Sequence, residues 1–208
     1  MFTGIVAAVG RITEVKPLGG AQAGVRLAID AGSLGLDDVA LGDSIAVEGA
    51  CMTVVQKAGN SFEVEVSRES LSKTAGLAAP GEVNLEKALS LSTKLGGHLV
   101  SGHVDGLGRV EKFAAVGESW ELVVRAPRDL AKYLAYKGSI TVNGVSLTVN
   151  RVTDGADGAD FSINLIPHTI AMTTLRRLAP GALVNLEIDL IARYVERMLT
   201  ASIVPPNT

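Results

Sequence analysis

Short stretches in which apolar and polar residues alternate recur along the chain and predict β-strands. They cover residues 25–29, 44–48, 52–56 and 62–66, and then residues 122–126, 140–142, 146–153 and 161–166. Most of the 23 glycines lie between these stretches, as expected in a small barrel whose strands bend sharply at its corners. The pattern therefore predicts a mainly β protein with few helices.

The predicted strands belong to two copies of one unit. Gly4 and Gly10 return as Gly102 and Gly108, a shift of 98 positions in both cases. Residues 44–54 likewise match residues 139–149, and residues 83–86 match residues 184–187. Because this period is about the size of a small domain, it indicates duplication of a whole fold. We expect two tandem, similar six-stranded Greek-key β-barrels with short helices, over residues 1–97 and 98–189.

A C-terminal helix over residues 190–202 is predicted by apolar residues that repeat with a helical period. They fall at positions i, i+3, i+4, i+7 and i+8 and are Ile191, Tyr194, Val195, Met198 and Leu199. Arg193, Glu196 and Arg197 fall on the opposite side. The apolar stripe either folds back on the second barrel or associates with copies of itself. It is too short to decide between these alternatives.

Composition narrows the class of protein. The 208 residues are 47% hydrophobic and 20% charged, which excludes disorder, and no apolar run approaches the ~18 residues of a membrane span. A net charge of -3 without a long cluster of Lys or Arg argues against a nucleic-acid partner. Cys51 is the single cysteine, so no internal disulfide forms, and the first residues do not resemble a secretory signal. We expect a cytoplasmic protein.

The two copies place nucleophilic side chains at matching positions. Cys51 aligns with Ser146, and Thr53 aligns with Thr148. Since residues two apart on a strand share a face, each pair points into one space. Cys51 could instead be a small buried hydrophobe, with the hydroxyls bonded to nearby backbone. The recurrence of a thiol or hydroxyl in both copies favours a functional role.

The chain also has three histidines. His103 aligns with Ile5 and is expected to act as a donor or base in a pocket, whereas His98 is equally compatible with an exposed joint between the copies. His168, after Pro167, is expected to be a solvated loop residue. No zinc-binding spacing and no glycine-rich phosphate loop occurs, so we expect neither a metal nor a cofactor.

Seven motifs stand in order along nearly the whole chain, at residues 1–6, 49–54, 96–105, 137–140, 144–149, 165–167 and 184–189. Together they resemble the riboflavin synthase alpha chain family. The resemblance implies an enzyme that converts two molecules of 6,7-dimethyl-8-ribityllumazine into riboflavin and 5-amino-6-(D-ribitylamino)uracil by transfer of a four-carbon unit. It also implies a homotrimer through the C-terminal helix, with the reacting pair between the first barrel of one subunit and the second barrel of another.

The same resemblance implies two substrate pockets. The first comprises Gly4, Ile5, Val6, Cys51, Met52, Thr53, Glu65, Val66, Ser67, Arg68, Glu69 and Ser70. The second comprises Gly102, His103, Val104, Lys137, Ser146, Leu147, Thr148, Asn164, Leu165, Ile166, Pro167, His168 and Thr169, with Asp189 as a further polar group. Candidate catalytic residues are Ser44, Cys51, His103 and Ser146. The 7-methyl group of the lumazine is acidic, so a base such as His103 needs to be only moderately strong.

Two departures from the family and one alternative function remain open. Glu48 stands where the family commonly has Asn, and Asn143 stands where it commonly has Asp, which leaves the polar contacts at both positions undetermined. The alternative is a non-catalytic lumazine or flavin carrier, like the fluorescent lumazine proteins. Residues 96–105 and 146–148 are intact, which favours the enzyme over the carrier and over a purely structural scaffold.

Overall fold

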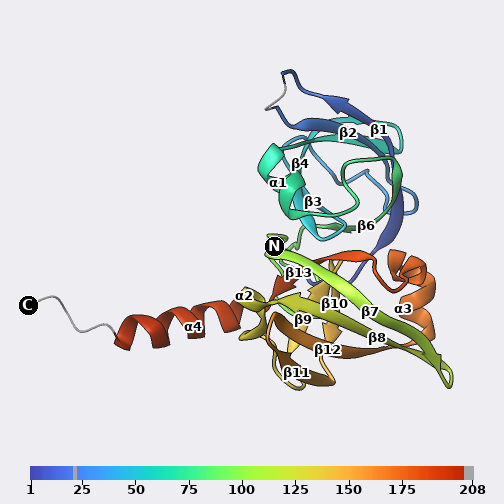
Figure 1. Ribbon diagram of the computed structural model, residues 1–208. Coiled ribbons are helices and arrows are strands. Elements are labelled where there is room, and N and C mark those ends of the chain that lie inside the picture. The colour runs from blue at the N-terminus through green and yellow to red at the C-terminus, as the bar shows by residue number, and fades with distance from the viewer. Residues whose placement is uncertain (21–22, 204–208) are drawn as a thin grey trace, which may run out of the picture.

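The computed structural model, which describes residues 1–20 and 23–203, contains two β units stacked on one another (Figure 1). The first copy forms one unit and the second copy forms the other. A helix projects from the second unit, away from both. The prediction of a mainly β, duplicated fold is confirmed.

The first unit is a closed barrel with the strand order β1-β2-β5-β4-β3-β6. Its elements are β1 (Ala8–Pro17), β2 (Val25–Asp30), β3 (Ser44–Val47), β4 (Ala50–Ala58), β5 (Ser61–Val66), α1 (Arg68–Lys73) and β6 (Gly81–Lys87). In β5, Phe62, Val64 and Val66 are buried while Glu65 is exposed, as the alternation predicts. Strands β3, β4 and β5 follow one another, and β6 returns beside β3, which is a Greek key.

The second unit is a curled sheet of seven strands in the order β10-β9-β13-β7-β8-β12-β11. Its strands are β7 (Gly106–Val116), β8 (Ser119–Pro127), β9 (Ser139–Val142), β10 (Val145–Thr148), β11 (Arg151–Gly155), β12 (Gly158–Leu165) and β13 (Leu183–Ile188). Its short helices are α2 (Arg128–Ala131), α3 (Pro167–Met172) and the 3-10 helix η1 (Thr174–Arg177).

The seventh strand arises because β10 and β11 together replace the single strand β4. At the break, Val149 N donates to Gly138 O at 3.0 Å, while Asn150 N donates to Ser162 O at 2.8 Å. The chain thus leaves one neighbouring strand for the other. In the first unit the register of β4 shifts at the matching place, just after Val54. A bulge in one copy is therefore a break in the other.

Two tight turns touch where the units meet. The β3–β4 turn holds Glu48 and Gly49 at φ +48° and +88°, and the β9–β10 turn holds Asn143 and Gly144 at φ +51° and +79°. Positive φ at both central residues is typical of the type I′ hairpin turn. A Cβ added to Gly49 would lie 2.6 Å from the Gly144 nitrogen, so the two backbones touch. Only glycine permits this approach.

Asparagine side chains cross the same contact in both directions. Asn84 Nδ2 donates to the Asn143 carbonyl at 2.9 Å, and Asn185 Nδ2 donates to the Glu48 carbonyl at 2.8 Å. The donors and acceptors are fully buried or nearly so. Each barrel therefore satisfies backbone groups of the other, which fixes the two units relative to one another.

The side chains of Glu48 and Asn143, the two positions that depart from the family pattern, make equivalent contacts. Glu48 Oε2 accepts from Asn84 N at 2.7 Å, and Asn143 Oδ1 accepts from Asn185 N at 2.8 Å. Glu48 Oε1 also accepts from Thr174 Oγ1 at 2.9 Å. Burial nevertheless raises the pKa of Glu48 to about 7, because removal from water disfavours the charged carboxylate more than these bonds favour it.

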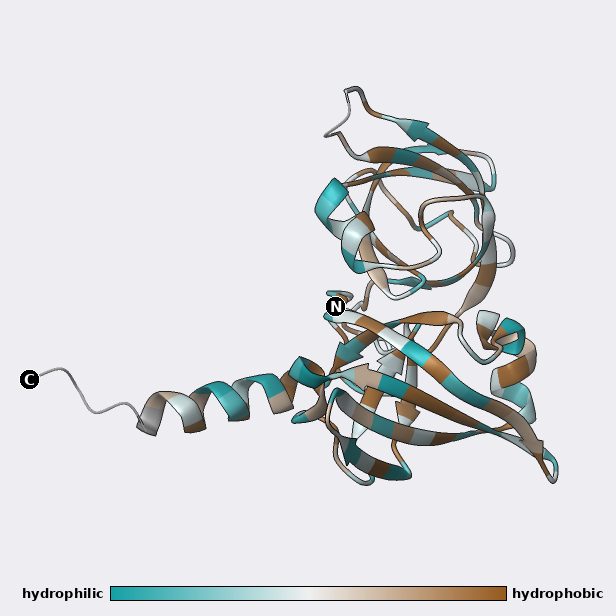
Figure 2. Ribbon diagram, in the orientation of Figure 1, coloured by the Kyte–Doolittle hydropathy of each residue, from teal (hydrophilic) through white to brown (hydrophobic). Residues whose placement is uncertain are grey.

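The C-terminal helix α4 (Leu190–Ile203) does not fold back on its own barrel. Its polar side is held by the second unit: Lys132 Nζ donates to Glu196 Oε1 at 2.6 Å, and Arg193 pairs with Asp105. The predicted apolar stripe faces solvent, with exposed fractions of 64% for Ile191, 62% for Tyr194, 44% for Val195, 61% for Met198 and 63% for Leu199. Figure 2 shows the alternation of hydrophilic and hydrophobic residues along this helix.

We expect Glu48→Gln to remove a pH dependence of stability. Between the usual carboxyl pKa of 4.5 and the folded value of about 7, the folded chain keeps a proton that the unfolded chain releases. The free energy of unfolding therefore falls as pH rises through this window, by on the order of 3 kcal/mol in total. Gln has nearly the shape of the protonated Glu48 side chain and stays uncharged at every pH.

Chemical denaturation at pH 5 and pH 8 measures this difference. The wild type should lose about 2.5 kcal/mol more between the two pH values than the variant does. Glu118→Gln, at an exposed carboxylate, should behave like the wild type. Equal losses in the wild type and Glu48→Gln would show that Glu48 ionises normally in the folded protein.

Candidate functional site

The first residues of each copy cross to the barrel of the other copy. We call residues 2–6 opening loop 1 and residues 100–104 opening loop 2. Phe2 and Val100 pair through two backbone hydrogen bonds of 2.7 and 3.1 Å, so the loops run side by side in opposite directions. Beyond this pair the loops diverge, and each enters the other unit.

Backbone hydrogen bonds fix the crossing. Ser146 N, on β10 of the second unit, donates to the Gly4 carbonyl at 2.7 Å. Cys51 N, on β4 of the first unit, donates to the Gly102 carbonyl at 2.7 Å. These are the two positions at which the copies carry a nucleophilic side chain. Each candidate nucleophile is therefore packed against a loop from the opposite copy.

Glycine makes the crossing sterically possible. Gly4 has φ +75°, and a Cβ there would lie 2.6 Å from Ser146 Cβ. Gly102 has φ +79°, and a Cβ there would lie 2.7 Å from Cys51 Cβ. Both the left-handed backbone and the close approach exclude a larger residue.

A buried glutamate at the end of β6 holds opening loop 1. Glu86 Oε1 accepts from both the backbone nitrogen and the hydroxyl of Thr3, each at 2.7 Å, and Oε2 accepts from Gly4 N at 3.0 Å. Burial raises the pKa of the Glu86 carboxyl, and these three bonds oppose that shift.

Glu187, at the end of β13, holds opening loop 2 in the same way. Its Oε1 accepts from the backbone nitrogen and hydroxyl of Ser101 at 2.7 Å each, and its Oε2 accepts from Gly102 N at 2.9 Å. Burial also raises the pKa of this carboxyl. The duplication has thus preserved a complete hydrogen-bonded unit, not merely a sequence motif.

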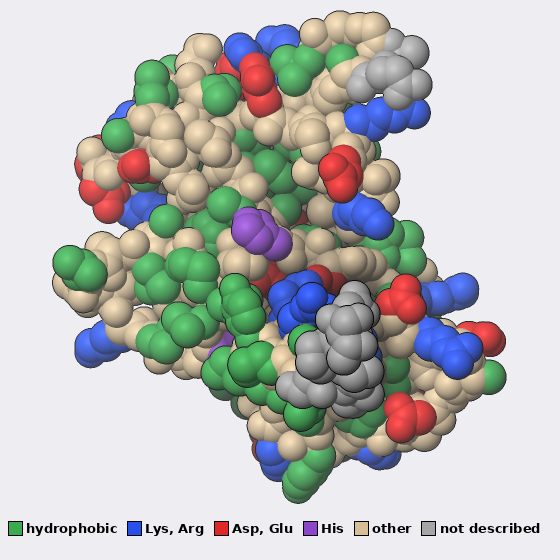
Figure 3. All heavy atoms as spheres, turned by 90° about the vertical axis from the view of Figure 1, so that its left-hand side faces the viewer, with side chains coloured by type: hydrophobic (Ala, Val, Ile, Leu, Met, Phe, Trp, Pro, Cys, Tyr) green, Lys and Arg blue, Asp and Glu red, His purple; other side chains and the backbone are tan. Residues whose placement is uncertain are grey.

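A cavity of about 220 Å³ lies where opening loop 2 meets the first barrel. It is lined by Ala50, Cys51, Met52, Glu69, Ser70, Lys73, Thr74, Gly102, His103 and Val104. Strand β4, helix α1 and opening loop 2 therefore form its walls. The Cys51 side chain is half-buried, and His103 is exposed at the mouth. In Figure 3 a histidine side chain lies on the surface where the two units meet.

The composition of this cavity corrects the predicted grouping of residues. The sequence placed residues 4–6 in the first pocket and residues 102–104 in the second. That grouping is wrong, because residues 102–104 line the cavity of the first barrel and Gly4 contacts Ser146 of the second. Alignment of the copies shows which positions are equivalent, but it does not show whether a loop packs on its own barrel or on the other.

Polar side chains share one face of the β3–β4 hairpin, as the alternation predicted. Ser44 pairs with Thr53, and Ala46 pairs with Cys51, so these side chains lie on the same face of the sheet. Met52 lies on the other face and is 5% exposed. The β9–β10 hairpin repeats this arrangement with Ser146 and Thr148.

His98 joins the second site, and the sequence left its position undecided. Its Nδ1 lies 2.8 Å from Ser146 Oγ, and its backbone nitrogen donates to the Thr3 carbonyl at 3.1 Å. Among the described residues, His98 Nε2 is buried without a hydrogen-bond partner. Burial lowers the pKa of His98, and the charge of Asp189 opposes that shift, so the neutral imidazole is favoured.

Other predicted residues of the first pocket have structural roles. Val66 is 1% exposed in the barrel core, and the side chain of Ser67 accepts from Ser70 N at 3.0 Å and caps helix α1. Glu65 is paired with Arg26 at 2.6 Å. Arg68 opens α1 and is exposed. Only the α1 end of this stretch therefore reaches the cavity.

Predicted residues of the second pocket divide similarly. Leu147 and Leu165 belong to the core, at 9% and 0% exposed. Ile166, Pro167 and His168 are exposed at the start of α3, and Thr169 follows them half-buried. Lys137 Nζ donates to Asn150 at 2.9 Å, and Asn164 accepts from Ser119 at 2.9 Å. Asp189 accepts from Ile191 N at 2.9 Å at the start of α4.

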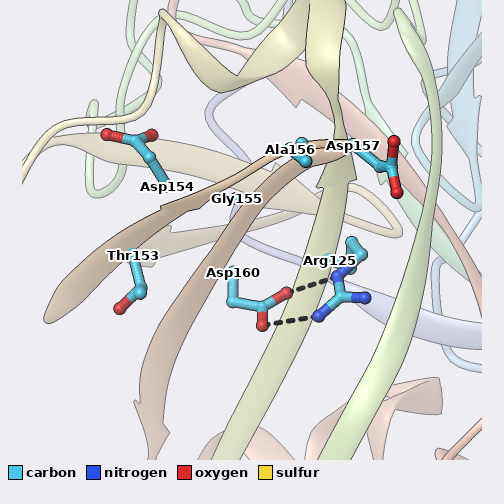
Figure 4. Close-up of a pocket in the computed structure, with 8 residues that line it drawn as sticks. Arg125, Thr153, Asp154, Gly155, Ala156, Asp157 and Asp160 are labelled. Atoms are coloured by element: carbon cyan, nitrogen blue, oxygen red, sulfur yellow. Dashed lines mark hydrogen bonds and ion pairs between the residues drawn. The ribbon is translucent and has the colours of Figure 1, made fainter.

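A cavity of about 210 Å³ at the β11–β12 turn contains none of the predicted residues (Figure 4). Arg125 fills one side of it with a two-bond ion pair to Asp160, at 2.8 Å each, and Asp154 and Asp157 point away from one another.

Within residues 1–20 and 23–203, no three His, Cys, Asp or Glu side chains form a group that could hold a metal ion. No helix in the same ranges is long and apolar enough to cross a membrane.

Comparison with known proteins gives a consistent result. Residues 3–88 and 101–189 each match the lumazine binding domain family. The chain is 44% identical over 201 residues to riboflavin synthase of Photobacterium phosphoreum, covering 96% of this chain and 89% of that protein. It is also 44% identical over 207 residues to riboflavin synthase of Mycobacterium tuberculosis, covering 97% and 100%.

Solved structures of LumP have the same fold. LumP complexed with riboflavin has a TM-score of 0.79 at 25% identity and covers 90% of this chain and 99% of its own. LumP complexed with 6,7-dimethyl-8-(1'-D-ribityl) lumazine has a TM-score of 0.77 at 25% identity, with the same coverage.

We expect Gly102→Ala to destabilise the protein through the loop crossing. The new Cβ would meet Cys51 and would sit at positive φ, so the free energy of unfolding should fall by about 3–4 kcal/mol. Gly59→Ala is the matched control, since Gly59 has φ +56° with nothing within 4 Å, and it should cost only about 1–2 kcal/mol. Chemical denaturation measures both. Equal losses would contradict tight packing of opening loop 2.

Proposed function

The chain belongs to the riboflavin synthase family, and from this membership we propose how its two pockets share the reaction. The reaction converts two molecules of 6,7-dimethyl-8-ribityllumazine into riboflavin and 5-amino-6-(D-ribitylamino)uracil by transfer of a four-carbon unit. The two products together contain all the atoms of the two substrates. No oxidant or reductant is therefore consumed.

The duplicated site is the observation that carries the proposal. Each copy supplies a hairpin with a nucleophilic side chain, Cys51 or Ser146, and each hairpin is completed by an opening loop from the other copy. Two like pockets suit a reaction between two like molecules. Holding two rings in the reactive orientation contributes up to ~7–11 kcal/mol in favourable cases.

We assign different chemistry to the two pockets. In the first, Ser44 and Cys51 share the hairpin face, and His103 stands at the cavity mouth as a proton acceptor. In the second, the neutral imidazole of His98 accepts a proton through the Ser146 hydroxyl, which it contacts at 2.8 Å. Deprotonation of the 7-methyl group and addition of water or a nucleophile to the second ring require such groups.

We further propose that three copies associate through α4. The stripe from Ile191 to Leu199 is more than 40% exposed at every apolar position, while the polar side of the helix is bound to the second unit. Self-association would remove this apolar stripe from water, which is energetically favourable. The reacting pair would then lie between the first barrel of one subunit and the second barrel of another.

The division into residues 1–97, 98–189 and 190–202, the cytoplasmic location and the remaining predicted contact residues stay predictions. The family match supports the division, because residues 3–88 and 101–189 each carry one domain. A reducing compartment would keep the single thiol of Cys51 free.

The carrier function is less well supported. LumP shares the fold and is described in complex with riboflavin, but it is 25% identical to this chain, against 44% for the synthases. Carrier and enzyme would both bind a lumazine, so binding does not discriminate between them. Turnover does.

Purified protein should form riboflavin from 6,7-dimethyl-8-ribityllumazine in the presence of a chelator and without an added cofactor. One riboflavin should appear for every two substrate molecules consumed, as absorbance and chromatography measure. Cys51→Ser should reduce turnover and leave the native molecular mass unchanged, because the side chain lines the cavity away from α4. Stoichiometric binding without product would support the carrier instead.

Leu199→Asp should dissociate the trimer, because it places a charge in the proposed contact. We expect sedimentation to show monomers and turnover per chain to fall by on the order of a hundredfold, since one chain alone cannot hold two rings face to face. Val116→Asp, at a residue 52% exposed at the end of β7, is the control and should keep both mass and turnover. A monomer with full turnover would refute the intersubunit site.

A further inference from the structure

We propose that Glu86 and Glu187 are crossed positioning residues, each of which belongs to one barrel and shapes the pocket of the other. The inference builds on the proposed function, because it takes the cavity beside Cys51 and the equivalent position beside Ser146 as the two ligand pockets. It concerns how these pockets are held in shape, and it assigns Glu86 and Glu187 no contact with the ligand.

The crossing follows from two short chains of hydrogen bonds. Glu86, on β6 of the first barrel, binds Gly4 N at 3.0 Å, and the Gly4 carbonyl accepts from Ser146 N in the second barrel. Glu187, on β13 of the second barrel, binds Gly102 N at 2.9 Å, and the Gly102 carbonyl accepts from Cys51 N in the first. One residue therefore separates each carboxylate from the pocket of the opposite unit.

Each carboxylate also orients a histidine of that opposite pocket. The Thr3 nitrogen and hydroxyl are bound by Glu86, and the Thr3 carbonyl accepts from His98 N at 3.1 Å. We call each glutamate, together with the three loop donors that it binds, a clasp. In the clasp of Glu187, the Ser101 hydroxyl donates to Glu187 at 2.7 Å and accepts from His103 N at 3.2 Å. Displacement of either loop would therefore move a histidine as well as a wall of the pocket.

The carboxylates serve hydrogen bonding and not ion pairing. Glu86 and Glu187 are 8% and 3% exposed, and within residues 1–20 and 23–203 neither takes part in a salt bridge. Each accepts three bonds from its loop instead. A carboxylate accepts at both oxygens, which the two adjacent backbone N–H groups and the hydroxyl require. The cost of burying the charge is offset by those three donors.

Glutamine tests this geometry with a minimal change. Its single carbonyl oxygen can still accept from Thr3 or Ser101, but its NH2 group would face the N–H of Gly4 or Gly102, donor against donor. The bond nearest the crossing is lost while the volume of the side chain is preserved. Glu48→Gln is the matched control, since Glu48 is a buried glutamate of the same barrel interface that binds neither loop.

The single cysteine allows each pocket to be read separately. In the wild type, the rate of Cys51 alkylation by iodoacetamide reports on the first pocket. In Cys51→Ser/Ser146→Cys, the only thiol reports on the second. The riboflavin concentration that halves the alkylation rate measures the affinity of each pocket in the full-length chain.

We expect Glu86→Gln to raise this concentration about tenfold in the second pocket and less than about twofold in the first, since a lost bond to a charged group costs at least ~1.5 kcal/mol. Glu187→Gln should do the reverse, and Glu48→Gln should change neither. An effect on the residue's own barrel, or equal effects on both pockets, would overturn the inference. If riboflavin does not slow alkylation of the single thiol in the wild type or in Cys51→Ser/Ser146→Cys, the pocket assignment itself is overturned.

Thr3→Val and Ser101→Ala repeat the test if a glutamine variant does not fold. Each removes one side-chain donor to a clasp and leaves the backbone donors in place. Thr3→Val should weaken binding in the second pocket only, and Ser101→Ala in the first only, by about threefold to tenfold. Effects without this crossed pattern would overturn the inference in the same way.

Discussion

The hydrogen bonds that carry each opening loop into the opposite barrel are the constraint on which the rest of the structure depends. Gly4 and Gly102 deliver their carbonyls to Ser146 N and Cys51 N, and buried glutamates hold the loops in place behind them. The cavity beside Cys51 is not complete within one copy, because opening loop 2 forms one of its walls. The contact of the two glycine turns and the crossed asparagines then follow as a second layer that keeps the barrels in register. Formation of the two sites therefore requires both copies of the unit.

The duplication conserves the scaffold more closely than the chemistry. Both clasps use the same three bonds, and the side chains of Glu48 and Asn143 accept from the equivalent backbone nitrogens. The differences fall at Cys51 against Ser146 and at the histidines that approach them. A symmetric frame with unlike reactive groups suits a reaction in which two identical molecules must play different parts. Burial raises the pKa of Glu48, and this titration is confined to the first copy because Asn143 at the matching position has no ionisable group.

Periodicity predicted those features of the fold that depend on one strand or one helix at a time. The alternation in β5, the shared face of Cys51 and Thr53 and the stripe on α4 all follow from local geometry, and the two-copy pattern followed from simple alignment. The loop crossing could not be found in this way, because Gly4 has the same sequence neighbours whether it packs on its own barrel or on the other. His98 was undecided for a related reason. Its partner, Ser146, lies 48 residues away, and no local pattern joins them.

The exchange of loops also bears on how such a chain could arise. The groups that meet at the two crossings are the same: a glycine carbonyl from an opening loop, and the backbone nitrogen of the second residue of a hairpin strand. A primordial polypeptide of half this length would have carried both halves of that complementarity, and two such molecules would have closed it by dimerising head to head. Fusion of two genes would then have preserved an existing quaternary contact as an intramolecular one, and it would have freed the two active halves to diverge.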